Sequence, residues 1–98
     1  VYPGRGVQAP VIPMLDELTL DAREMEPPEP FEKATAILHH LKPGQYLRIL
    51  HRRVPYPLFE FCRKMLLLHQ VEETATASYE IIIYFPEDAD SLHSEGVL

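Results

Sequence analysis

The chain of 98 residues contains a single cysteine and no tryptophan, and none of its apolar runs is long enough to cross a bilayer. Because Cys62 stands alone, an internal disulfide and a cysteine-based zinc cluster are excluded. A lone thiol is typical of a reducing compartment, so we expect a cytoplasmic protein. The N-terminus lacks a basic segment followed by an apolar core, and we expect no signal peptide.

Positive charge is also scarce. The formal net charge is −6, from 9 Lys and Arg against 15 Asp and Glu. This acidic balance argues against nonspecific binding to nucleic acid or to an anionic membrane. The hydrophobic fraction of 46% is typical of a globular protein, and a chain of this length builds a single core. We therefore expect one small domain that binds neither nucleic acid nor a membrane.

The two ends of the chain show neither helical nor strand periodicity. Residues 1–14 are rich in proline and glycine, which is typical of a flexible tail or linker. Residues 87–98 are acidic and equally aperiodic, and we predict a second tail there. The folded domain is therefore expected over residues 15–86.

Between these ends the hydrophobic pattern changes repeatedly from a strand period to a helix period. It predicts strands over residues 17–22, 45–51, 71–77 and 78–85, and helices over residues 31–41 and 58–68. Pro30 and Pro57 fit the first turns of these helices, and Pro43 with Gly44 ends the first one. The order β-α-β-α-β-β with right-handed crossovers places both helices on one face of a mixed four-stranded sheet. The predicted fold is an α/β two-layer sandwich.

The opposite face of this sheet is predicted to remain uncovered. It would expose large apolar side chains, namely Tyr46, Leu50, Ile82 and Tyr84. An exposed apolar surface of this kind is unusual for a monomer and favours self-association or docking. We therefore expect a protein partner, with a homodimer as one form of it.

Charged residues gather at the entrance of the first helix. Asp21 and Arg23 are two apart on a strand, so they share a face and are expected to pair. Glu26 and Glu29 precede the helix, where its dipole favours carboxylates, and Glu29 suits a capping position. Two interpretations stay open: a salt-bridged and capped helix entrance, or a pocket for a ligand or partner.

The second helix has its own proline-rich entrance, which follows Arg52 and Arg53. With the first two strands parallel, both helix N-termini emerge at the same edge of the sheet. The two arginines then lie near Glu26 and Glu29 and neutralise them. Alternatively, the arginines and the two helix N-termini together bind an anion.

The segment "LTLDAREMEPPEPFEKATAILHHLKPGQYLRIL" combines a strand end, a proline-rich helix start and a Pro-Gly turn in a specific order. In this combination it resembles the TusA/SirA-like superfamily of small sulfur-carrier proteins. In that superfamily L-D-x-R-x-x ends a strand, C-P-x-P opens a helix and P-G precedes the next strand. The resemblance covers roughly residues 15–85, and the matching positions are Leu20, Asp21, Arg23, Pro28, Glu29, Pro30, Pro43 and Gly44.

One position departs from the superfamily pattern. The carrier cysteine of C-P-x-P aligns with Pro27, which has neither sulfur nor a nucleophile, so TusA-type persulfide transfer there is excluded. The chain is similar to the cysteine-less branch of the superfamily, an uncharacterised bacterial domain family. A retained fold without its nucleophile implies a non-enzymatic binding or accessory module. Its candidate ligand- or partner-binding residues are Asp21, Arg23, Glu26, Pro27, Pro28, Glu29, Arg52 and Arg53.

Two alternatives assign chemistry to other residues. Sulfur transfer through Cys62 is the first, although helical spacing places this thiol on an apolar face, where thiols are unreactive. Binding of a metal or redox ligand near His51 and the helix entrances is the second, because His51 ends a strand where sites of α/β proteins often lie. Apart from that metal we expect no cofactor, and we identify no catalytic residue.

Overall fold

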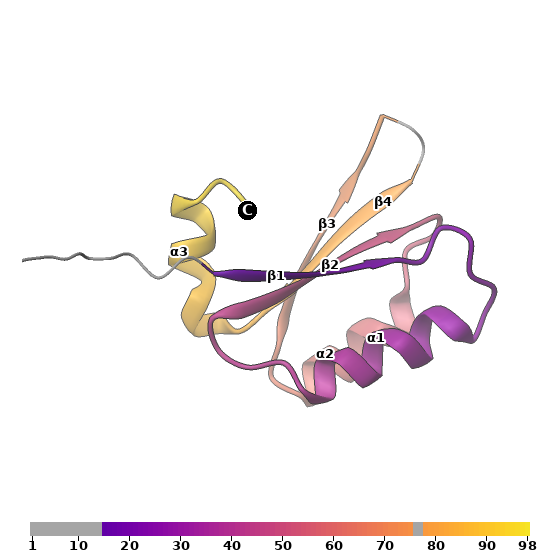
Figure 1. The fold of residues 1–98 in the computed structure, drawn as a ribbon, viewed down its shortest axis with the longest axis horizontal. Helices are drawn as coiled ribbons and strands as arrows, with labels where there is room; N and C mark the ends of the chain where they lie inside the picture. Colours follow the sequence, from indigo (N-terminus) through magenta and orange to yellow (C-terminus); the bar gives the residue numbers. More distant parts are fainter. Residues whose placement is uncertain (1–14, 76–77) are drawn as a thin grey trace, which may run out of the picture.

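One mixed sheet of four strands carries the fold (Figure 1). The computed structural model describes residues 15–75 and 78–98. Its elements are β1 (Asp16–Asp21), α1 (Glu29–His39), β2 (Gln45–His51), α2 (Tyr56–Lys64), β3 (Leu68–Glu73), β4 (Tyr79–Tyr84), the 3-10 helix η2 (Pro86–Asp88) and α3 (Ala89–Ser94). The strand order is β1-β2-β4-β3. The predicted α/β two-layer sandwich is confirmed, whereas the tail predicted over residues 1–14 lies outside the described residues.

Strand directions follow from the connections between the strands. β1 and β2 are parallel and are joined through α1, whereas β4 is antiparallel to both β2 and β3. The parallel pair is in register from Asp16 opposite Gln45 to Asp21 opposite Leu50. The carboxyl ends of β1 and β2 therefore lie at the same edge of the sheet, and each leads into a helix.

The main core fills the space between the sheet and the helices α1 and α2, which pack together on one face (Figure 1). Every second residue of a strand points into this core. Burial of one large aliphatic side chain contributes about 1.5 to 3 kcal/mol to folding. The largest fully buried side chains between these layers are Leu38, Leu47, Ile49, Leu58, Cys62, Ile81 and Ile83.

The second predicted helix is shorter than its apolar pattern suggests. α2 ends at Lys64, and Leu66 adopts a φ of 61°, in the left-handed region that a branched side chain rarely occupies. The reversal turns the chain back into β3, which begins at Leu68. Consequently Leu66 is 79% exposed and Leu68 lies on the sheet instead of the helix.

The C-terminal segment is not the tail predicted for residues 87–98. It forms η2 and α3, and α3 lies on the opposite side of the sheet from α1 and α2 (Figure 1). Leu92 is fully buried there, and the N–H of Gly44 donates to Asp88 Oδ2 at 2.8 Å. A helix of six residues with one buried anchor is too short to show a helical period in the sequence.

The docking of α3 also corrects the prediction of an uncovered sheet face. Tyr46, Ile82 and Tyr84 are buried in a second, smaller cluster with Leu92, and Leu50 is half-buried. The part of this apolar surface that Tyr46, Ile82 and Tyr84 form is thus covered by the chain's own C-terminal helix.

A polar network occupies the same face beside this cluster. Arg48 on β2 pairs with Glu17 on β1 at 3.0 Å and with Glu80 on β4 at 2.5 Å, and the Tyr46 hydroxyl donates to Glu17 at 2.9 Å. Partial burial by itself raises the pKa of Glu17, but hydrogen bonds from Thr19, Tyr46 and Arg48 outweigh it and lower the pKa. Three strands are therefore tied together by charge beside the apolar cluster on this face.

Within residues 15–75 and 78–98, every helix falls short of the length and apolar character that a membrane span requires.

Candidate functional site

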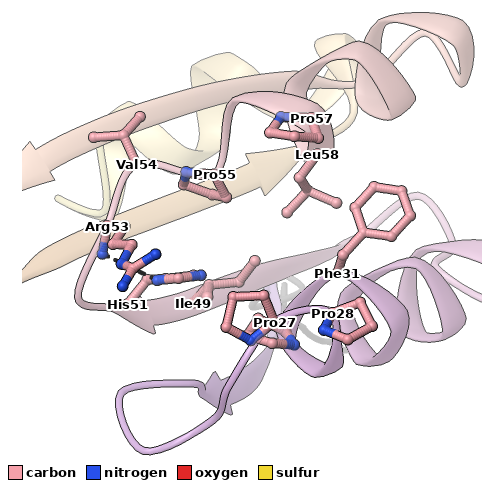
Figure 2. A pocket seen from close by; sticks show the side chains of 11 residues that line it. Pro27, Pro28, Phe31, Ile49, His51, Arg53, Val54, Pro55, Pro57 and Leu58 are labelled. Atoms are coloured by element: carbon pink, nitrogen blue, oxygen red, sulfur yellow. Dashed lines mark hydrogen bonds between the residues drawn. The ribbon is translucent and has the colours of Figure 1, made fainter.

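A pocket of about 290 Å³ lies where the first turns of α1 and α2 meet the carboxyl end of β2 (Figure 2). Parallel pairing of β1 with β2 brings both helix entrances to this edge of the sheet, as the sequence predicts. We call this cavity the entrance pocket, and its lining residues are Pro27, Pro28, Pro30, Phe31, Ile49, His51, Arg53, Val54, Pro55, Pro57 and Leu58.

Proline forms most of two facing walls of the entrance pocket. In Figure 2, Pro27 and Pro28 line one wall, and Pro55 and Pro57 lie across from them beside Leu58. A proline ring fixes φ and lacks an N–H, so the second position of a helix accepts it without loss of a hydrogen bond. The walls are therefore apolar, and their backbone is stiff before anything binds.

The base and one end of the entrance pocket are also apolar. Ile49 and Leu58 are core residues, 1% and 2% exposed, whereas Phe31 is 40% exposed. The helical period of α1 predicts Phe31 as a core residue, but its ring lies at the rim of the pocket. The ring meets that of Phe61 edge to face, with the two ring centroids 6.3 Å apart. An exposed aromatic ring beside prolines offers a contact surface for another apolar group.

Polar groups occur only at the other end of the entrance pocket. His51 and Arg53 lie together there, away from Phe31 (Figure 2). The backbone N–H of Arg53 donates to Nδ1 of His51 at 3.0 Å. In the neutral ring the proton is then on Nε2, which makes Nε2–H a donor. Burial, followed by the charges of Arg52 and Arg53, lowers the pKa of His51 and keeps the ring neutral near pH 7.

The guanidinium of Arg53 has no anionic partner in the part of the chain that the structure describes. Its neighbour Arg52 differs, because it lies outside the pocket lining and its Nη2 is 3.6 Å from Oε2 of Glu26. The expected neutralisation of the acidic entrance thus involves only one of the two arginines, and the second is left at the pocket.

The remaining predicted residues lie outside the entrance pocket. Arg23 and Asp21 form the expected pair, with two side-chain hydrogen bonds of 2.8 and 2.9 Å. Hydrogen bonds from Arg23 lower the pKa of Asp21 to about 2. The capping role predicted for Glu29 is wrong, because Glu29 is the first helical residue and Pro28 occupies the N-cap without a side-chain hydrogen bond.

Of the candidate residues, the structure therefore brings Pro27, Pro28, Arg53 and His51 together around one cavity. Sequence reasoning missed the apolar character of the site and most of its lining: Pro30, Phe31, Ile49, Val54, Pro55, Pro57 and Leu58. One signal was present in the sequence, since a proline stands at the second position of both helices, Pro30 in α1 and Pro57 in α2.

The residues proposed for alternative chemistry lie in different surroundings. Cys62 is 0% exposed in the main core and does not line the pocket, and burial raises the pKa of its thiol to about 11. Such a thiol is almost entirely protonated at neutral pH. Across the described residues, no three His, Cys, Asp or Glu side chains are grouped so that they could hold a metal ion.

These features define the class of the protein: a small α/β sandwich with a proline-walled pocket where its two main helices begin. The model of the family described as "Uncharacterized conserved protein (DUF2249)" matches residues 19–84, and the chain belongs to this family. The matched region includes every residue that lines the entrance pocket and stops before α3. No curated protein and no solved structure matches the chain.

Proposed function

We propose that this chain is a non-enzymatic binding module, related to the TusA/SirA-like carriers, whose binding site is the entrance pocket. The observation that carries this proposal is the pocket itself. Pro27, where the resemblance places the carrier cysteine, lines this pocket. No lining side chain carries a thiol, hydroxyl or carboxylate group. A preformed apolar cavity with few polar groups is the usual form of a small-molecule site.

The resemblance explains why a pocket would be retained at this position without sulfur chemistry. In a carrier of that superfamily, the helix entrance holds the cysteine that carries the persulfide. Here the same turn carries proline, and Pro28 and Pro30 keep its shape. We infer that the site has been kept for recognition while covalent transfer has been lost.

The two alternatives receive less support from the geometry. Sulfur transfer through Cys62 requires a reactive and accessible thiolate, and this thiol is buried with a raised pKa. Metal binding at His51 requires further ligands, and the nearest polar neighbour in the pocket is the cation Arg53. The single free cysteine favours a cytoplasmic setting, and the entrance pocket is the surface on which we propose a protein partner.

A fragment screen followed by amide chemical shifts tests this proposal. Val54 lines the pocket and is half-buried, so Val54→Trp fills the cavity with an indole ring. Leu68→Trp is the matched control, because it adds the same ring on a partly exposed strand position outside the pocket.

We expect fragment hits to shift the amides around the pocket in the wild-type chain and in Leu68→Trp, and to be lost in Val54→Trp. Both variants are first shown to unfold at the wild-type urea midpoint within error. Hits that persist unchanged in Val54→Trp would refute the pocket as the binding site.

A further inference from the structure

We infer that the entrance pocket takes a small organic anion that combines one flat apolar ring with a carboxylate; the inference rests on the proposed function. The ring would lie between the two proline walls, and the carboxylate would accept hydrogen bonds from His51 and Arg53. Each part of this ligand is required by a different set of residues.

The size of the ligand follows from the cavity. A volume of about 290 Å³ is at the lower limit of pockets that hold small organic molecules, so there is room for one ring with a short substituent. The walls present proline rings together with Phe31 and Leu58, which offer apolar contacts and no buried acceptor. A flat ring fits between two such walls and buries both of its faces.

The anionic group follows from the unshared donors at the polar end. The Arg53 guanidinium has no carboxylate partner within the described residues, and the Nε2–H of His51 has no protein acceptor there. Two donor side chains at the same end of the pocket match the two oxygens of a carboxylate. The nearby carboxylate of Glu26 does not compete, because Glu26 lies outside the pocket lining.

The same surroundings disfavour other ligand charges. No carboxylate lines the pocket, so an ammonium group placed there would face a cation without compensation. A neutral amide retains one acceptor but loses the charge-assisted part of the hydrogen bonds, which are about twice as strong as neutral ones.

Three probes of the same size separate these possibilities: phenylacetate, 2-phenylacetamide and phenethylamine. Each is titrated into isotope-labelled protein, and binding is located and quantified from amide shifts at the pocket. We expect phenylacetate to bind about tenfold more tightly than the amide and phenethylamine to bind most weakly.

Two arginine variants form a matched pair for this test. Arg53→Gln removes the pocket cation and is expected to abolish the preference for phenylacetate over the amide. Arg52→Gln removes an equally charged neighbour that is engaged with Glu26, and the preference is expected to survive. A preference that falls equally in both variants would indicate general charge attraction and overturn the inference.

The remaining outcomes distinguish this inference from the proposed function. Equal affinity for phenylacetate and 2-phenylacetamide within the pocket would overturn the anionic ligand and leave the binding module standing. Phenylacetate bound elsewhere, or not at all, would also overturn it. The proposed function would then be decided separately by the fragment screen with Val54→Trp.

Discussion

The reactivity of Cys62 separates a binding module from a sulfur carrier. Only the thiolate attacks an alkylating reagent. Burial raises the pKa of this thiol from its usual value of 9.0 to about 11, so the thiolate fraction at pH 7 falls by about a hundredfold. Its complete burial adds a second barrier, since the reagent reaches the sulfur only when α2 opens.

Alkylation by iodoacetamide, followed by intact mass spectrometry, measures this difference. We expect the native rate at pH 7 to be at least about a hundredfold below the rate in concentrated urea, and to rise about tenfold for each pH unit up to the shifted pKa. The matched control is the double variant Cys62→Ala/Arg63→Cys, which moves the thiol to the adjacent, exposed position of α2. Its alkylation should be nearly as fast in the native state as in urea.

The raised pKa of Cys62 also has a consequence for stability. The unfolded chain releases this proton near pH 9, before the folded chain does, so unfolding is favoured as the pH rises from 9 to 11. Relative to Cys62→Ala, the wild-type chain should lose about 2 to 3 kcal/mol of unfolding free energy over that interval. Native alkylation within a few-fold of the rate in urea, or no relative loss of stability, would refute the reasoning and restore sulfur transfer as a candidate.

Three further predictions concern the fold. Leu92→Ala should lower the free energy of unfolding, measured in urea, by about 2 to 3 kcal/mol because Leu92 is the buried anchor of α3. The control Ser91→Ala, at an exposed neighbouring position, should change it by less than about 0.5 kcal/mol. Equal effects of the two substitutions would contradict the docking of α3. Gly44→Ala should cost about 1 kcal/mol in the same assay, because the φ of 92° is unfavourable although no atom lies within 4 Å of the added Cβ; wild-type stability would contradict the assigned turn. In a carbon-detected NMR titration, the Asp21 carboxylate should lose its charge only near pH 2, and Arg23→Gln should return the midpoint of the Asp21 titration toward 3.8. An unchanged midpoint in Arg23→Gln would show that the pair does not form in solution.

Most of the fold was predictable because its strands and helices have distinct hydrophobic periods. Leu47 and Ile49 alternate on β2, and Leu58 and Cys62 recur at helical spacing on α2, and all four are buried as these periods require. The short elements were not predictable in this way. α3 contributes one fully buried residue, Leu92, and one apolar side chain does not establish a period.

The candidate site was predictable in position but not in character. Parallel pairing of the first two strands was enough to bring both helix entrances together, and with them Pro27 and Arg53. The sequence predicts a site among charged residues, yet Asp21 and Glu26 pair with arginines outside the cavity. The sequence predicts Pro57 as a helix start and Pro27 and Pro28 as binding candidates, but only the tertiary structure shows that Pro27 and Pro28 lie across a pocket from Pro55 and Pro57.

The most direct test of the binding module is a set of intermolecular nuclear Overhauser effects between phenylacetate and the side chains of the wild-type protein. Binding in the entrance pocket predicts contacts from the ring protons of phenylacetate to Phe31 and to the methyl groups of Val54 and Leu58. Contacts confined to Leu66 and Leu68, the exposed apolar residues after α2, would contradict it.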